Sequence, residues 1–226
     1  MTDDEVFRLN SRASSVRLEL LLASGAVAVA AALSVGCGGS STTSPSQPPA
    51  MLHGEVSDPT GDAVAVAGVS NPPDLVHGTV DVLAGTITFN IRFAPVSFDR
   101  QTTGVSIDLD TDRNPSTGVS GGSGLGIDYV VSLWGPTNQV VIERALANGT
   151  CVSTAINPCF AAVGTASLIV NADGLQATVP LSLLGNGDGR LNFRVFAYYV
   201  ASLLAGSPSI LTDVMPNAAL PPSSVQ

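Results

Sequence analysis

The stretch Thr86–Phe93, TITFNIRF, carries the clearest strand pattern in this chain of 226 residues. Its apolar side chains occupy every second position and alternate with threonine, asparagine and arginine. This pattern is typical of a β-strand with one buried face and one face in water. Residues 76–82 show a second strand pattern, and Leu-Ala-Gly at 83–85 connects the two. The segment therefore predicts a β-hairpin.

Similar patterns recur along the rest of the chain, and clusters of Gly, Pro, Asn and Asp separate them. The Gly-Pro-Thr-Asn run at 135–138 and the Asn-Ala-Asp-Gly run at 171–174 are turn signals of this kind. Eight or nine short strands with such turns predict an all-β fold, an antiparallel β-sandwich of immunoglobulin or jelly-roll type. The further strands are expected within residues 105–110, 127–134, 139–145, 168–170, 175–179 and 191–199.

The composition excludes two classes of partner. All nine basic residues are arginines, and from Cys37 onward six arginines stand against fourteen carboxylates, for a net charge of −8. Nucleic-acid binding needs clustered positive charge, and so does electrostatic docking on anionic lipid, so we expect neither. Twelve of those fourteen carboxylates are aspartates, which favour turns and oxygen-ligand sites over helices.

The N-terminal region has the parts of an export signal. Three arginines precede an apolar segment at residues 18–35. The sequence Leu-Ser-Val-Gly-Cys at 33–37 resembles the lipobox of bacterial lipoproteins, in which the cysteine is lipidated and becomes the mature N-terminus. The resemblance implies a signal peptide at 1–36, lipidation of Cys37, and a place in the bacterial cell envelope, on the outer membrane and facing the periplasm or the surface. The alternatives are a cleaved secretory signal with an incidental cysteine, or an uncleaved anchor.

Residues 37–51 form the expected linker, and residues 52–226 the expected single domain. The linker sequence GGSSTTSPSQPPA at 38–50 has no charge and almost nothing to bury, so it predicts a flexible tether. With Cys37 assigned to lipid, Cys151 and Cys159 remain as an even pair in an exported domain. They predict a disulfide, because no histidine lies near them to complete a zinc site.

The segment DLDTDRNPSTG at 108–118 is the strongest candidate for a metal site. Calcium prefers six to eight oxygen ligands, and alternating Asp and Asn positions can supply them. The expected ligands are Asp108, Asp110, Asp112, Asn114 and Thr117. The loop is not an EF-hand, because the required glycine and terminal glutamate are missing. The alternative is an Asp-rich turn whose side chains cap their own backbone.

Five short motifs occur in order between residues 55 and 217. They are Asp-Pro-Thr-Gly-Asp at 58–62, Asp74 before a strand, the segment at 108–118, Gly-Ile-Asp-Tyr at 126–129, and Thr-Asp-Val-Met-Pro at 212–216. Together they resemble bacterial extracellular β-sandwiches related to family-nine carbohydrate-binding modules and DOMON domains. This resemblance implies a sandwich that binds sugar, haem or calcium, or an accessory domain on a cell-surface protein.

Sugar binding needs aromatic side chains that present a flat face. Trp134 and Tyr198 are the candidates, although a buried position in the core is the alternative for Trp134. The match to G-x-S-x-G at 118–122 precedes a strand rather than a helix, so it does not predict a nucleophile elbow. We therefore expect a non-catalytic binding or assembly module whose partner is a glycan or a cell-envelope protein. A carbohydrate-binding lipoprotein is the first alternative, and a hydrolase with an acid pair in a cleft is the second.

Overall fold

A computed structural model describes residues 51–120, 124–152, 154, 158–185, 187–201 and 209–226. The expected signal peptide, Cys37 and the linker up to residue 50 lie outside these described residues. In the part of the chain that is described, no helix has the length and apolar character needed to cross a membrane.

The fold is all-β and antiparallel, as the sequence predicts. Eleven strands form one sheet in the order β1-β2-β3-β10-β9-β8-β7-β4-β11-β12, with β13 paired to β11, while β5 and β6 pair separately. The strands are β1 Leu52–Ser57, β2 Leu75–Leu83, β3 Thr86–Phe93, β4 Thr103–Asp110, β5 Val119–Ser120, β6 Gly126–Ile127, β7 Tyr129–Trp134, β8 Gln139–Ala145, β9 Phe160–Val170, β10 Gly174–Pro180, β11 Asn192–Val200, β12 Ser209–Met215 and β13 Ser223–Ser224. Two 3₁₀ turns accompany them, η2 Gly135–Thr137 and η3 Leu181–Leu184.

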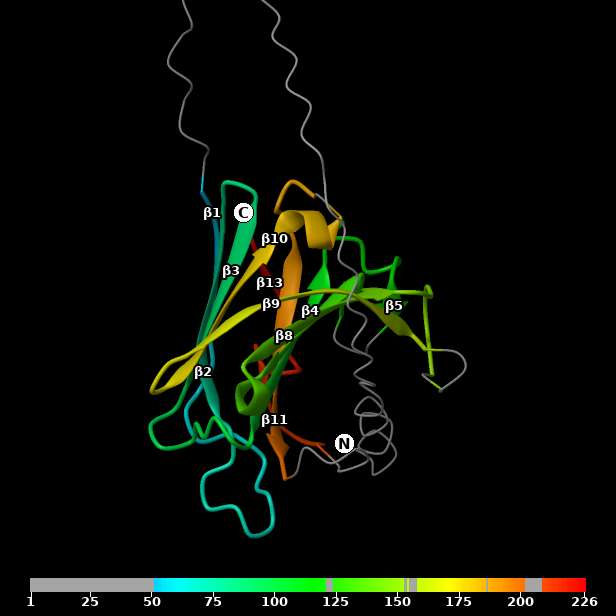
Figure 1. Ribbon diagram of the computed structural model, residues 1–226. Coiled ribbons are helices and arrows are strands. Elements are labelled where there is room, and N and C mark those ends of the chain that lie inside the picture. Colours follow the sequence, from blue (N-terminus) through cyan, green and yellow to red (C-terminus); the bar gives the residue numbers. More distant parts are fainter. Residues whose placement is uncertain (1–50, 121–123, 153, 155–157, 186, 202–208) are drawn as a thin grey trace, which may run out of the picture.

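The sheet folds over on itself, so that two layers enclose one core. Figure 1 shows β1, β2, β3 and β10 facing β4, β8 and β11, with β9 crossing between the two groups. Apolar side chains from both layers join in a single buried cluster, which includes Phe89 on β3 and Phe193 on β11. The arrangement is a sandwich that approaches a closed barrel.

The predicted hairpin is confirmed. The β2–β3 turn consists of Ala84 and Gly85, whose φ angles of 50° and 82° are both in the left-handed region. A two-residue turn of this type matches the right-handed twist of the flanking strands. The hydroxyl of Thr86 also donates a hydrogen bond to the carbonyl oxygen of Leu83 at 2.8 Å. The turns predicted at 135–138 and 171–174 likewise connect β7 to β8 and β9 to β10.

The two ends of the strand order, β1–β2 and β11–β12, come together along a line that we call the seam. At one end of the seam the C-terminal segment closes the gap with backbone hydrogen bonds. Ser224 pairs with Asn192 of β11, and the backbone N–H groups of His53 and Gln226 each donate to the other's carbonyl oxygen, at 3.1 and 3.2 Å. At the other end, the N–H of Val64 donates to the carbonyl oxygen of Thr212 at 2.7 Å.

The predicted disulfide between Cys151 and Cys159 is present, with the two Cα atoms 5.8 Å apart. Cys159 packs in a second apolar cluster with Val119, Leu125 and Ile127, beside β5 and β6. The disulfide therefore attaches Cys151 to the apolar cluster beside the minor sheet.

Candidate metal centres

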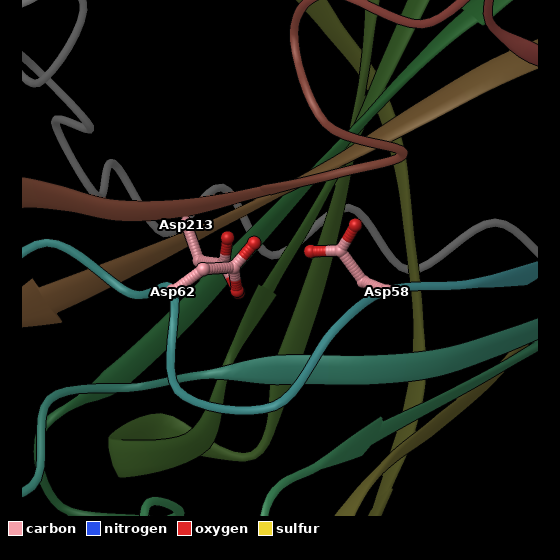
Figure 2. A group of neighbouring side chains, drawn as sticks. All are labelled: Asp58, Asp62 and Asp213. Carbon is pink, nitrogen blue, oxygen red and sulfur yellow. The ribbon is translucent and has the colours of Figure 1, made fainter.

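Three aspartates converge at the end of the seam that the C-terminal segment does not close. Asp58 directly follows β1, Asp62 lies in the loop at 58–74, and Asp213 is in β12. One carboxylate oxygen from each lies within 4.8 Å of those of the other two. Figure 2 shows the Asp58 carboxylate directed toward those of Asp62 and Asp213. We call these three residues the seam cluster.

Specific donors hold two of these carboxylates in place. The backbone N–H of Leu75, the first residue of β2, donates to Oδ2 of Asp213 at 2.6 Å, and the N–H of Val214 donates to Oδ1 at 2.7 Å. The side-chain amide of Asn217 donates to Oδ2 of Asp62 at 3.0 Å. Asp213 thus joins β12 to β2 where the two strands have no ladder of backbone hydrogen bonds.

The Asp58 carboxylate has no such donors. Although the residue as a whole is half-buried, each of its carboxylate oxygens exposes less than 1 Å² to solvent, and neither accepts a hydrogen bond from the described residues. Burial, together with the charges of Asp213 and Asp62, raises the pKa of Asp58 from 3.8 to about 7, and the nearby backbone N–H of Asn217 acts in the opposite direction. A buried carboxylate in this position is stable only if a proton or a cation neutralises it.

The neighbouring acids are perturbed in the same direction. Burial, together with the charges of Asp62 and Asp74, raises the pKa of Asp213 to about 6 despite its two backbone hydrogen bonds. Asp74, which is 6% exposed, lies just before β2 and accepts a hydrogen bond from the N–H of Gly61 at 2.7 Å through Oδ2, while its Oδ1 has no donor among the described residues. Burial also raises the pKa of Asp74. Four carboxylates are therefore concentrated where the two sheet edges meet.

The loop predicted from the sequence forms a second acidic group. Asp110 at the end of β4 is fully buried, Asp112 is exposed, and Asp128 lies between β6 and β7. One carboxylate oxygen from each again lies within 4.8 Å of the others. Burial and the hydrogen-bonded contact with Asp112 raise the pKa of Asp110. For Asp112, burial acts to raise the pKa, but hydrogen bonds from Thr117 and Asn114 outweigh it and lower the pKa. We call Asp110, Asp112 and Asp128 the loop cluster.

Two further predicted ligands, Asn114 and Thr117, form hydrogen bonds with this cluster. The backbone N–H of Asn114 donates to Asp110 at 3.0 Å and to Asp112 at 2.9 Å, and the Thr117 hydroxyl donates to Asp112 at 2.9 Å. The side-chain oxygen of Asn114 accepts a hydrogen bond from the N–H of Ser116 at 3.1 Å. Side-chain donors and turn backbone thus satisfy much of this loop, which is the arrangement expected of an Asp-rich turn.

Asp108 lies outside the loop cluster. It is the cross-strand partner of Arg194 on β11, and the two residues are 1% and 2% exposed. Burial lowers the pKa of Arg194, and the charge of Asp108 acts in the opposite direction. The guanidinium also donates to the carbonyl oxygen of Leu220. The structure therefore places Asp108 beside a buried cation, because Asp108 is paired across β4 and β11 before the chain turns into the loop.

Trp134 and Tyr198 lie in one row across the sheet. Both are cross-strand partners of Gly104, Trp134 on β7 and Tyr198 on β11, and both are half-buried. Their neighbours Leu133 and Ala197 are fully buried in the core, so the aromatic side chains point to the outer face. A Cβ atom on Gly104 would lie 2.9 Å from Cζ3 of Trp134, so the glycine leaves room for the indole ring.

The sequence pattern did not single out Asp128 or the seam cluster as metal ligands. Asp128, Asp58 and Asp213 each belong to a short motif that supports the resemblance to carbohydrate-binding and DOMON domains. That order of motifs was the available signal, but it does not show which carboxylates meet. No protein-family model matches this chain, and no curated protein matches its sequence.

Proposed function

We propose that this chain is an exported, lipid-anchored β-sandwich of the bacterial cell envelope that acts as a non-catalytic binding or assembly module. The observation that carries the proposal is the disulfide between Cys151 and Cys159. Disulfides persist in oxidising compartments, and this pairing uses both cysteines of the domain and leaves Cys37 for the lipid. The uncharged linker then ends where β1 begins, so its role is to hold the domain away from the membrane.

The anchor is tested by lipid labelling in a bacterial host. The full chain should incorporate an alkyne-bearing palmitate and sediment with membranes, and Cys37→Ala should lose the label and most of the membrane association. A label of equal intensity on the variant would overturn the lipoprotein assignment.

Bound calcium at the loop cluster is part of this proposal, because oxygen ligands from Asp110, Asp112 and Asp128 meet the preference of Ca²⁺. Calcium would compensate the repulsion among three neighbouring carboxylates. Asp110→Asn/Asp112→Asn, which we call the loop variant, should lose one equivalent of Ca²⁺ in isothermal titration calorimetry of the full chain in detergent. Equal stoichiometry and affinity in the two proteins would reduce the loop to a hydrogen-bonded turn.

The row of Trp134, Gly104 and Tyr198 supports a second candidate, a carbohydrate-binding lipoprotein. Two aromatic side chains on one sheet face, separated by a glycine, can present flat apolar surface to a sugar ring. A glycan array should then show binding that Trp134→Ala removes. Cleavage of an array glycan would instead indicate the hydrolase alternative, and binding unaffected by Trp134→Ala would place the contact surface elsewhere.

A further inference from the structure

We propose that the seam cluster of Asp58, Asp62 and Asp213 is a second site for a hard divalent cation, with Ca²⁺ as the expected ion, and that the ion joins the two edges of the sheet. This site is distinct from the loop cluster and does not depend on the proposed function. Its geometry fits the ion, because oxygens bound to one Ca²⁺ at 2.3–2.6 Å lie at most about 5 Å apart, and the three carboxylates are within 4.8 Å of one another.

The Asp58 carboxylate provides the second, independent observation. Its two oxygens are inaccessible to solvent, have no hydrogen-bond donor among the described residues, and point into the cluster (Figure 2). Buried polar groups in native proteins are generally satisfied, so two orphaned oxygens on one carboxylate call for a ligand. A ligand that satisfies several carboxylate oxygens at once is a cation.

The described side chains do not supply that cation. The arginine ion pairs described on the surface join Arg92 to Asp173 and Arg190 to Asp188. Within the described part of the chain, the ion pairs of arginine and histidine do not include Asp58, Asp62 or Asp213. A bound metal ion is the remaining way to neutralise the cluster while the carboxylates stay ionised.

The position of the cluster gives the ion a structural role. At the far end of the seam, the C-terminal segment supplies backbone hydrogen bonds to both β1 and β11. Near the seam cluster, hydrogen bonds cross the gap from Leu75 to Asp213, from Val64 to Thr212 and from Asn217 to Asp62. A cation here would attach the loop at 58–74 to β12, as the C-terminal segment attaches β1 to β11.

Isothermal titration calorimetry with Ca²⁺ on the full chain in detergent, after chelator treatment, tests the proposal. The loop variant should retain one equivalent of Ca²⁺, and Asp58→Asn added to it should abolish that binding or weaken it at least tenfold. Asp173→Asn is the matched control, because it removes the same charge from an exposed ion pair. A loop variant that binds no Ca²⁺, or Asp58→Asn with unchanged binding, would overturn the seam site.

Limited proteolysis provides a measurement that needs no substitution in the cluster. The sequence Ala-Val-Ala-Val-Ala at 63–67 lies in the loop and suits an elastase. In the loop variant, Ca²⁺ should slow cleavage within 63–67 at least several-fold, because the ion would fasten this loop to β12. The protease is checked against a small peptide in both buffers. A cleavage rate that Ca²⁺ leaves unchanged would contradict the proposal even if Asp58→Asn failed to fold.

Discussion

Replacing Asp58 with asparagine should have opposite effects on stability in the presence and absence of calcium. In chelator at pH 8, Asp58→Asn removes a carboxylate that is buried, lacks hydrogen-bond donors and faces two other acids. The asparagine amide can instead donate to the neighbouring carboxylates. The variant should therefore be more stable than its parent without metal, and less stable with it, because it loses a ligand to the ion.

The magnitude follows from the shifted pKa. One pKa unit corresponds to about 1.4 kcal/mol, so the rise from 3.8 to about 7 sets a ceiling of about 4 kcal/mol on the cost of ionising Asp58. Because the residue is half-buried, solvent screening reduces this cost, and we expect about 1–2 kcal/mol. An ion at about 100 times its dissociation constant stabilises the parent by roughly 2.7 kcal/mol. For a domain of this size each kcal/mol moves Tm by about 2–4 °C.

The assay is thermal unfolding of the full chain in detergent, with the loop variant as parent so that only the seam cluster responds. In chelator, Asp58→Asn should raise Tm by about 2–8 °C. In saturating Ca²⁺, the parent should gain roughly 5–10 °C and the variant should gain little, which reverses their order. Asp173→Asn should show no reversal. If Asp58→Asn were the less stable protein in both buffers, the reasoning about an uncompensated carboxylate would be refuted.

Three further outcomes follow from the structure. In chelator, the free energy of unfolding should fall as pH rises from about 4 to 7. The raised pKa values of Asp58 and Asp213 let the folded state keep protons that the unfolded state has lost. Urea titrations at several pH values measure this decrease, which is at most about 1.4 kcal/mol per pH unit for each proton. Replacing Cys151 and Cys159 with serine should lower the free energy of unfolding, measured by urea titration, by roughly 2–3 kcal/mol. Reductant should not change the stability of this variant. Gly104→Ala should force the Trp134 ring to shift and lower the free energy of unfolding by roughly 1–3 kcal/mol. The shift should also move the fluorescence emission maximum, because Trp134 is the single tryptophan of the chain. An unchanged spectrum and an unchanged stability would mean that the ring does not occupy this space.

The class of fold could be predicted because its signals are local. Alternation in Thr86–Phe93 shows which face of β3 is buried, and short turns such as Ala84-Gly85 fix which strands are antiparallel neighbours. The disulfide could also be predicted, because its two cysteines are separated by only 8 positions in the sequence. In each case the interacting residues are close in sequence, so few chain conformations compete.

The loop cluster shows which contacts the local sequence pattern does not predict. Asp108 and Asp110 lie two positions apart in β4, so their side chains are on the same face of the strand. The neighbouring strand then separates their roles, because β11 sets Arg194 beside Asp108 and Asn192 beside Asp110. A cross-strand partner depends on which strands pair, and this information lies outside the segment itself.

The sequence by itself thus determined that the chain carries an antiparallel β-sandwich with a short disulfide loop. Only the tertiary structure decided that Asp58 and Asp213 meet, since they lie near opposite ends of the domain sequence. Their meeting depends on how far the whole sheet curls before β1–β2 approach β11–β12. That curvature is the summed effect of twist, bulges and packing over all the strands, and no local pattern specifies it.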